Sequence, residues 1–307
     1  MPPVLSIVGP TATGKSALAL DLAEPLGGEI INADALQVYR GFDIGTAKPG
    51  PEERRRVAHH LLDILDPGEP FSAGEFARRA REVIAEIRGR RRLPILVGGS
   101  GLYLRALIEG ISPIPPVDPR LRERLRARLA SEGLEELRAE LLVLDPESAE
   151  RLAPADSQRL LRALEVALGT GRPLSAWIRE RPVGGGGIDA VWIGLTLPRA
   201  LLYDRIAVRV ERMLAAGWVD EVRRLLAVGS SPSLPAFQAI GYRQLAGHIG
   251  GEVTLEEATE RIVRATRQYA KRQMTWFRRQ SGIEWFPAAE VSSSAILDHL
   301  ARTGLEA

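Results

Sequence analysis

Short apolar runs alternate with amphipathic stretches through the first third of the chain. The apolar runs are rich in β-branched residues and predict buried strands at 3–8, 29–34 and 93–99. Apolar residues at helical spacing predict helices at 15–27, 72–90 and 100–110. Ser72 and Glu75 form a capping-box pattern at the start of the second helix. Strand and helix in alternation predict a parallel sheet covered by helices on both faces.

The middle of the chain follows a different pattern. A proline-rich segment, 112–119, and a glycine run, 184–187, enclose a stretch in which only helical periodicity is found. Strand character then returns at 190–197. Helical periodicity follows at about 199–228, 236–248 and 254–281. We therefore predict an α/β fold with a mostly helical C-terminal third. The predicted domains are a parallel-sheet core at 1–112 and 190–307 and a helical insertion domain at 113–189.

Composition narrows the possible chemistry. The chain has no cysteine, which excludes disulfides and thiolate metal sites, and its four histidines are too scattered for a zinc site. A net charge of +2 and 45% apolar residues are ordinary for a globular protein. A membrane span needs about 20 consecutive apolar residues, and no run in the sequence approaches that length. The first residues do not resemble a signal peptide. We expect a soluble, cytoplasmic protein.

Lysine is rare in this chain. Among the 41 basic residues only Lys15, Lys48 and Lys271 are lysines. A general bias towards arginine accounts for the overall usage, but a compact ammonium and a planar guanidinium are not equivalent. These positions are therefore candidates for sites that need an ammonium group.

The first chemical motif is GPTATGKS, which fits the P-loop pattern G-x-x-x-x-G-K-[ST]. It follows a predicted strand and opens a predicted helix, so its backbone amides are expected to converge on phosphate oxygens. We expect Lys15 to reach these oxygens and Ser16 to bind Mg²⁺. The phosphate-binding residues are predicted to be Gly9, Pro10, Thr11, Ala12, Thr13, Gly14, Lys15 and Ser16.

A P-loop nucleotide hydrolase also needs a later apolar strand that ends in aspartate, and none is evident after the second predicted strand. The later apolar strand runs into Gly-Gly-Ser instead. The candidate carboxylate is Asp34, at the end of the second predicted strand. It could cap a short helix at 35–41, or it could act as a base beside the phosphate site, because ligands of open α/β sheets bind at the carboxyl ends of strands.

The second chemical motif is the helix predicted within 254–281. Its segment 261–281 contains seven basic residues and no acidic one. Their spacing places most of them on one side of a helix. Such a stripe is typical of a surface that follows a nucleic-acid backbone, and the alternative is a plain solvated helix face. Trp276 or Phe277 could stack on a base, although both suit a hydrophobic core better.

Together these motifs resemble the bacterial tRNA dimethylallyltransferases. The resemblance covers nearly the whole chain and rests on these segments: GPTATGKS, INADALQVYRGFDIGTAKP, HHLLDILDPGEPFSAGEF, PILVGGSGLYLRALIEG, DSQRLLRALEV, GYRQL and ATRQYAKRQMTWFR. The most specific combination is DIGTAKP followed by LVGGSGLY. The resemblance implies that the dimethylallyl group of dimethylallyl diphosphate is transferred to N6 of an adenosine beside the tRNA anticodon. Diphosphate would be released.

The resemblance also implies roles for individual residues. The P-loop would hold the diphosphate with Mg²⁺ on Ser16, and Asp34 would orient N6 and accept its proton. The catalytic residues would be Asp34, Lys15, Ser16, Ser100 and Arg209. The segment 238–243 would contact the tRNA anticodon stem-loop. Further contacts to the stem-loop would come from Asp34, Ala35, Leu36, Gln37, Ser100, Gln158, Arg159, Leu160, Leu161, Arg162, Lys271, Arg272, Gln273, Met274, Thr275, Trp276, Phe277 and Arg278. We expect a monomer.

Departures from the family pattern are small. Ser100 stands where the family often has Thr, which keeps a hydroxyl, and Ala35 stands where Ser is common. Three alternatives are an adenylate isopentenyltransferase that acts on free AMP or ATP, a small-molecule P-loop kinase, and an RNA-binding protein with a vestigial P-loop. The insertion and the basic stripe disfavour the first. The lack of a recognisable lid disfavours the second, and the intact Lys15 and Ser16 disfavour the third.

Overall fold

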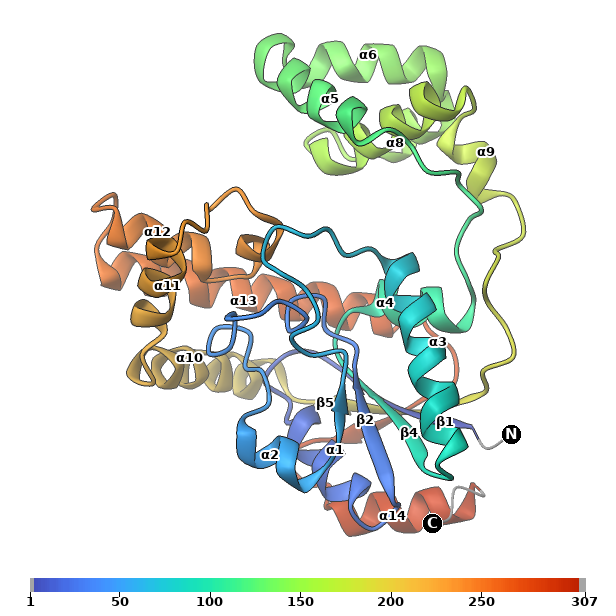
Figure 1. Ribbon diagram of the computed structural model, residues 1–307, viewed down its shortest axis with the longest axis vertical. Helices are drawn as coiled ribbons and strands as arrows, with labels where there is room; N and C mark the ends of the chain where they lie inside the picture. Colours follow the sequence, from blue (N-terminus) through green and yellow to red (C-terminus); the bar gives the residue numbers. More distant parts are fainter. Residues whose placement is uncertain (1–2, 304–307) are drawn as a thin grey trace. The chain divides into compact units, whose positions relative to one another are not determined.

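The structure is a computed structural model that describes residues 3–303. The chain forms two compact units. One unit comprises Met1–Ile108 and Gly186–Ala307, and the other comprises Glu109–Gly185. The first unit contains the sheet, and the second is helical (Figure 1).

The sheet has six strands in the order β3-β2-β4-β1-β5-β6, and every pairing in it is parallel. The strands are β1 (Val4–Val8), β2 (Gly28–Asn32), β3 (His59–His60), β4 (Leu93–Val97), β5 (Ala190–Thr196) and β6 (Ile283–Pro287). Leu5 in the central strand β1 lies opposite Ile95 on one side and Val191 on the other. The predicted α/β fold with a parallel sheet is therefore confirmed.

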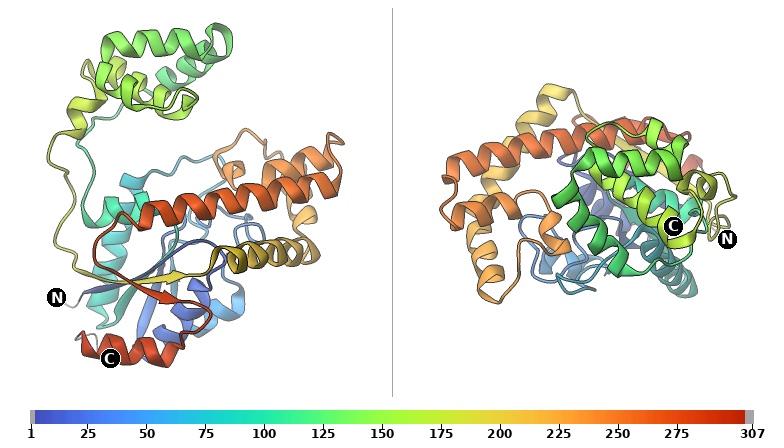
Figure 2. Two further views of the ribbon diagram at one scale, coloured as in Figure 1. Left: turned by 180° about the vertical axis from the view of Figure 1, so that it is seen from behind. Right: turned by 90° about the horizontal axis from the view of Figure 1, so that it is seen from above.

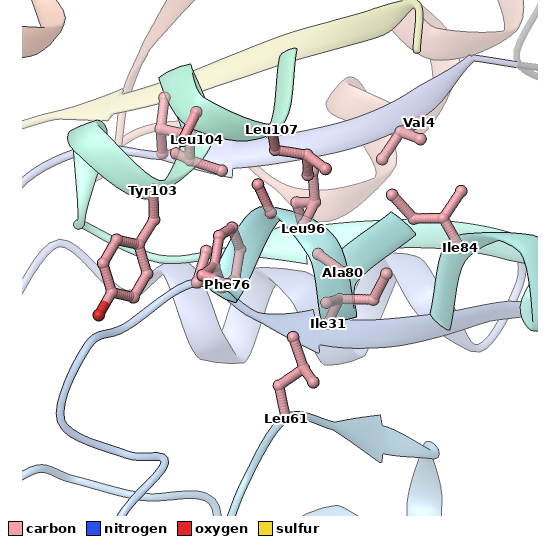
Figure 3. Close-up of a cluster of buried hydrophobic side chains, with 14 of the residues drawn as sticks. Val4, Ile31, Leu61, Phe76, Ala80, Ile84, Leu96, Tyr103, Leu104 and Leu107 are labelled. Atoms are coloured by element: carbon pink, nitrogen blue, oxygen red, sulfur yellow. The ribbon is translucent and has the colours of Figure 1, made fainter. Parts of the chain in front are cut away.

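Helices cover both faces of the sheet because its central strands are apolar on both sides. Val4 and Val8 pack with α3 (Ala73–Gly89) and α4 (Gly101–Ile108), and Figure 3 shows this core cluster. Leu5 and Ile7, which point the other way, pack with α1 (Lys15–Ala23) and α14 (Ser293–Arg302). Each fully buried aliphatic or phenyl side chain contributes about 1.5–3 kcal/mol.

The C-terminal helices of the first unit form a third cluster beside the sheet. They are α10 (Arg199–Ala215), α11 (Trp218–Ala227), the short 3₁₀ helix Pro235–Gln238, α12 (Tyr242–Ile249) and α13 (Leu255–Phe277). Their cluster is centred on Phe42, Trp218, Phe237 and Tyr242. Figure 2 shows α13 and α10 running side by side.

The second unit has its own hydrophobic core. Its helices are α5 (Pro119–Glu132), α6 (Leu134–Leu144), α7 (Pro146–Arg151), α8 (Ser157–Thr170) and α9 (Leu174–Ile178). Leu125, Leu137, Leu141 and Leu160 pack together at its centre. The buried Asp145 carboxylate accepts the N–H groups of Ser148 at 3.1 Å and Ser175 at 2.9 Å. This carboxylate therefore caps α7 and also holds the start of α9.

The fold departs from the sequence-based predictions in several places. No helix follows Asp34; residues 35–41 form turns, so the helix predicted there is wrong. The predicted helix at 199–228 is divided by Gly217, whose φ of 95° favours glycine. The strands β3 and β6 and the helices α2 (Pro51–Arg56) and α14 were not predicted.

The predicted capping box at the start of α3 is only half formed. The Ser72 hydroxyl accepts the Glu75 N–H at 3.1 Å, as predicted. The Glu75 carboxylate binds Arg78 and Arg79 instead of the Ser72 backbone. Two nearby guanidinium groups therefore replace the reciprocal bond of the box.

Within residues 3–303 no helix combines the length and the apolar character needed to cross a membrane.

Candidate active site

A cavity of about 620 Å³ opens where three neighbouring strands end. The P-loop follows β1, Asp34 follows β2 and Gly98 follows β4, and the parallel pairing brings these ends to one edge of the sheet. Residues of α10 and α13 complete the wall. The cavity thus occupies the position at which open α/β sheets bind ligands.

The P-loop adopts a conformation suited to an anion. Gly14 precedes α1 with a φ of 92° and provides no side-chain cap, so the first N–H groups of the helix remain available. A Cβ atom on Gly9 would come within 2.4 Å of the Leu195 carbonyl oxygen, so only glycine fits there. The Thr13 hydroxyl and the Lys15 ammonium donate to the Pro10 carbonyl at 2.9 and 2.6 Å.

Lys15, Asp34 and Arg209 all line this cavity, and each affects the charge of the others. Burial, assisted by the Arg209 guanidinium, lowers the pKa of Lys15 to about 7. Burial raises the pKa of the Asp34 carboxyl above its usual value, although the Leu36 N–H and both cations oppose this shift. Burial also lowers the pKa of Arg209. Two desolvated cations beside one carboxylate form a site that a multiply charged anion would stabilise.

The backbone around Asp34 fixes the position of its carboxylate. One carboxylate oxygen accepts the Leu36 N–H at 2.9 Å, and the Asn32 side chain bonds to both the N–H and the carbonyl of Asp34. The Ser100 hydroxyl accepts the Ala35 N–H at 3.2 Å. Asp34 therefore caps a turn and not a helix, and it lines the cavity.

The loop that carries the sequence DIGTAKP forms another wall of the cavity, and Lys48 anchors it. The Lys48 side chain is 1% exposed, and its ammonium donates to the Tyr39 carbonyl, Asp43 and Asp63, each at 2.6 Å. A compact ammonium can serve three convergent acceptors that a planar guanidinium would not fit. This geometry agrees with the idea that Lys48 occupies a site where arginine is not equivalent.

Helix α13 brings several side chains to the cavity. Tyr269, Arg272, Gln273 and Trp276 line it. Burial and the nearby Asp34 carboxylate raise the pKa of Tyr269, which lies beside Ser100. Sequence reasoning did not single out Tyr269, because a tyrosine in an amphipathic helix is usually a core residue.

The basic side chains of α13 and its C-terminal end are mostly exposed. Among the residues that the structure describes, none of the seven basic side chains between 261 and 281 forms an ion pair with an acidic group. Arg267 instead lies over the Tyr203 ring, at 5.0 Å. Uncompensated positive charge of this kind attracts a polyanion.

Some residues that the resemblance assigned to RNA are buried. Phe277 is fully buried in the core with α3 and α4, so of the two aromatic residues only Trp276 reaches the cavity. Leu160 is fully buried in the core of the helical unit. Gln158 and Arg159 are exposed on α8, and Arg162 pairs with the buried Glu165 at 3.2 Å.

Comparison with known proteins shows the family. A model of the IPP transferase family matches residues 37–280. The tRNA dimethylallyltransferase of Geobacter metallireducens is 52% identical over 91% of this chain and 90% of its own length. That of Halorhodospira halophila is 53% identical over 91% of each chain.

Solved structures agree with this relationship. The tRNA isopentenylpyrophosphate transferase of Bacillus halodurans superposes with a TM-score of 0.72 at 40% identity, covering 99% of this chain and 96% of that one. A eukaryotic dimethylallyltransferase acting on tRNA superposes with a TM-score of 0.82 at 28% identity, covering 98% of this chain and 79% of that one. This chain belongs to the IPP transferase family.

Proposed function

We propose that this protein transfers the dimethylallyl group of dimethylallyl diphosphate to N6 of the adenosine beside the anticodon of a tRNA. The observation that carries the proposal is the convergence of the P-loop, Asp34 and Arg209 on one cavity, which α13 borders with its basic side chains. The names of the relatives agree with this activity.

The first substrate is a diphosphate, and the cavity suits it. The free N–H groups at the start of α1, Lys15 and Arg209 would stabilise the negative charge that grows on the leaving diphosphate. The bond from C1 of the dimethylallyl group to the diphosphate oxygen breaks as the bond from N6 to C1 forms. The electron pair of the broken bond leaves with the diphosphate.

Asp34 is the group placed to handle the amine. N6 of adenine is barely acidic, so its proton becomes easy to remove only as the new bond forms. The Asp34 carboxylate would first orient N6 and then accept this proton. The raised pKa of Asp34 makes it a stronger base than an exposed aspartate.

The expected Mg²⁺ fits the donor atoms that are present. Ser16, in the first turn of α1, lines the cavity and offers one hydroxyl. Within residues 3–303 no group of three or more His, Cys, Asp and Glu side chains could hold a metal ion alone. Ser16, diphosphate oxygens and water would therefore share the ion, which would help to neutralise the leaving group.

The adenosine must leave the stack of the anticodon loop to reach Asp34, which costs a few kcal/mol. Phosphate contacts along the basic side chains of α13 would offset this cost. A free nucleotide needs no such surface, which disfavours an adenylate isopentenyltransferase.

The test is incubation with an unmodified anticodon stem-loop, Mg²⁺ and dimethylallyl diphosphate labelled in its hydrocarbon part. We expect label in the RNA and none in AMP offered separately. Label in AMP but not in the RNA would show that the proposed acceptor is wrong.

A further inference from the structure

Gln273 lies buried between two loops of the cavity. Its side chain is on α13 and is 6% exposed. Its amide oxygen accepts the N–H of Thr11, 262 residues away, at 2.9 Å. Its amide nitrogen donates to the carbonyl of Gly99, 174 residues away, at 3.1 Å. One side chain thus joins the P-loop to the loop that follows β4.

The surroundings are shaped closely around this amide. A Cβ atom on Gly99 would come within 1.9 Å of the Gln273 amide nitrogen, so the contact requires glycine there. Thr11 is followed by Ala12, whose φ of 65° is uncommon for a residue with a side chain. The bond to Gln273 fixes the backbone directly before this unusual conformation.

The neighbours of Gln273 on the inner face of α13 also contact the loops that surround the cavity. Tyr269, four residues earlier, lies beside Ser100 and lines the cavity. Trp276 packs so closely on Gly101 that a Cβ there would meet its ring at 2.2 Å. Lys271 and Arg278 are exposed. The inner face of the helix therefore contacts the catalytic loops, while most of its charged side chains lie on the outer face; Arg272 also lines the cavity.

We propose that Gln273 is a positioning residue for the diphosphate, and not one of the RNA contacts among which the family resemblance places it. It acts through the P-loop. Because Gln273 holds the N–H of Thr11, the remaining N–H groups of the loop keep the arrangement that binds the anion. The inference rests on the proposed function only in taking diphosphate as the ligand of the P-loop.

The first test distinguishes an effect of Gln273 on diphosphate binding from an effect on RNA binding. The dissociation constants of magnesium pyrophosphate and of an anticodon stem-loop are measured by calorimetry and filter binding for Gln273→Leu. We expect the pyrophosphate constant to rise at least about tenfold, the effect of losing one hydrogen bond at a buried group, with the stem-loop constant within about twofold. Gln268→Leu, at an exposed glutamine of the same helix, should change neither constant.

The opposite pattern, with RNA affinity lost and pyrophosphate affinity kept, would overturn the inference. So would a Gln273→Leu variant that binds both ligands as the unchanged chain does. A failure of the unchanged chain to bind pyrophosphate would overturn the proposed function as well. A result confined to the Gln273 variant would overturn only the role given to Gln273, so the two failures are distinguishable.

The second test uses Gln273→Glu, which keeps the shape of the side chain. A protonated carboxyl can accept from Thr11 and donate to Gly99, but a carboxylate cannot donate. The ratio of the KM for dimethylallyl diphosphate in this variant to that of the unchanged chain should therefore fall as the pH is lowered from about 8 to about 5. Dividing by the value for the unchanged chain removes the pH effects that the two chains share. A ratio that stays constant over this range would contradict the proposal.

Discussion

The hydroxyl of Tyr242 donates to the carboxylate of Glu221 at 2.6 Å, and both side chains are buried. The same carboxylate accepts the N–H groups of Asp43 at 3.2 Å and Ile44 at 2.8 Å. Glu221 on α11 therefore holds the start of the loop whose residues Gly45–Ala47 line the cavity. A charge buried in this way is stable only because several donors surround it.

Replacement of Glu221 should therefore destabilise the protein. Glu221→Gln places an amide NH₂ among hydrogen-bond donors, and we expect a loss of about 2–3 kcal/mol in the free energy of unfolding. Tyr242→Phe removes one donor of several and should cost less, about 1–2 kcal/mol. Urea denaturation measures both values, and a smaller loss for Glu221→Gln than for Tyr242→Phe would contradict this account.

The site that Lys48 occupies should not accept a larger cationic side chain. Lys48→Arg forces a bulkier group into a filled site and should cost about 1–3 kcal/mol of folding stability. Lys48→Met removes the ammonium that Asp43 and Asp63 share. Asp63 keeps Arg54 at 2.8 Å and the Asp43 side chain is 57% exposed, so we expect a cost of about 1–3 kcal/mol. Lys271→Arg, at an exposed position, is the control and should stay within about 0.5 kcal/mol in the same denaturation experiment. Equal stability of Lys48→Arg and the control would show that the site is not selective.

Diphosphate binding should depend on the protonation of Lys15. With a pKa of about 7 in the free chain, Lys15 is mostly neutral above that pH, whereas a bound anion favours the protonated form and raises its pKa. Between these two pKa values binding takes up a proton, so affinity should fall as the pH rises, by up to about tenfold per pH unit. Calorimetry of pyrophosphate in buffers of different ionisation enthalpy measures the uptake.

The ratio of affinities between the unchanged chain and Lys15→Met isolates this effect, because titration of the ligand itself cancels. If the ratio does not change between about pH 7 and pH 9, the lysine does not titrate on binding.

Asp34 should matter for transfer and not for binding. Asp34→Asn keeps the size of the side chain but cannot accept the proton from N6. We expect the rate of label transfer to fall by about 10²–10⁴, while the dissociation constant of the stem-loop changes little. Single-turnover assays with saturating RNA measure the rate directly. A rate close to that of the unchanged chain would leave Asp34 with only its role in the turn.

RNA affinity should fall steeply with salt, because phosphate contacts release bound counterions. If Arg278 contacts a phosphate, Arg278→Ala should reduce the slope of log affinity against log salt by about 0.7 to 0.9. Arg302→Ala offers a control, since Arg302 is exposed at the end of α14, a helix that packs against α1 on the sheet. A salt response that is flat, or equally altered in the control, would remove the role given to α13.

Several elements of the fold follow from local sequence pattern. The runs VLSIV and LPILV are apolar at every position except one, and a run of that kind in an alternating strand and helix order favours a parallel sheet. The edge strands, β3 and β6, show less of this continuous apolar pattern. The two-residue strand β3 is too short to have a period, and β6 has the sequence IEWFP with only partly buried or exposed positions. Pairing with β2 and with β5 created these two strands.

The P-loop and Asp34 could be identified from sequence because each depends on a few adjacent residues. The glycines of the loop set its backbone, and Asp34 lies two residues after a buried strand whose end is fixed by the sheet. Gln273, Glu221 and Tyr269 could not be identified in this way. Gln273 meets Thr11 across 262 residues, and Glu221 meets Ile44 across 177.

The sequence by itself therefore determined the central strands, most of the helices, the parallel arrangement and the phosphate loop, since those depend on short-range periodicity and on the conformations open to glycine. The tertiary structure decided which side chains share the cavity, which of them are buried and how their pKa values shift. Those properties depend on packing between segments that are distant in the chain. Burial and neighbouring charge, and not residue type alone, give Lys15 and Asp34 their altered pKa values.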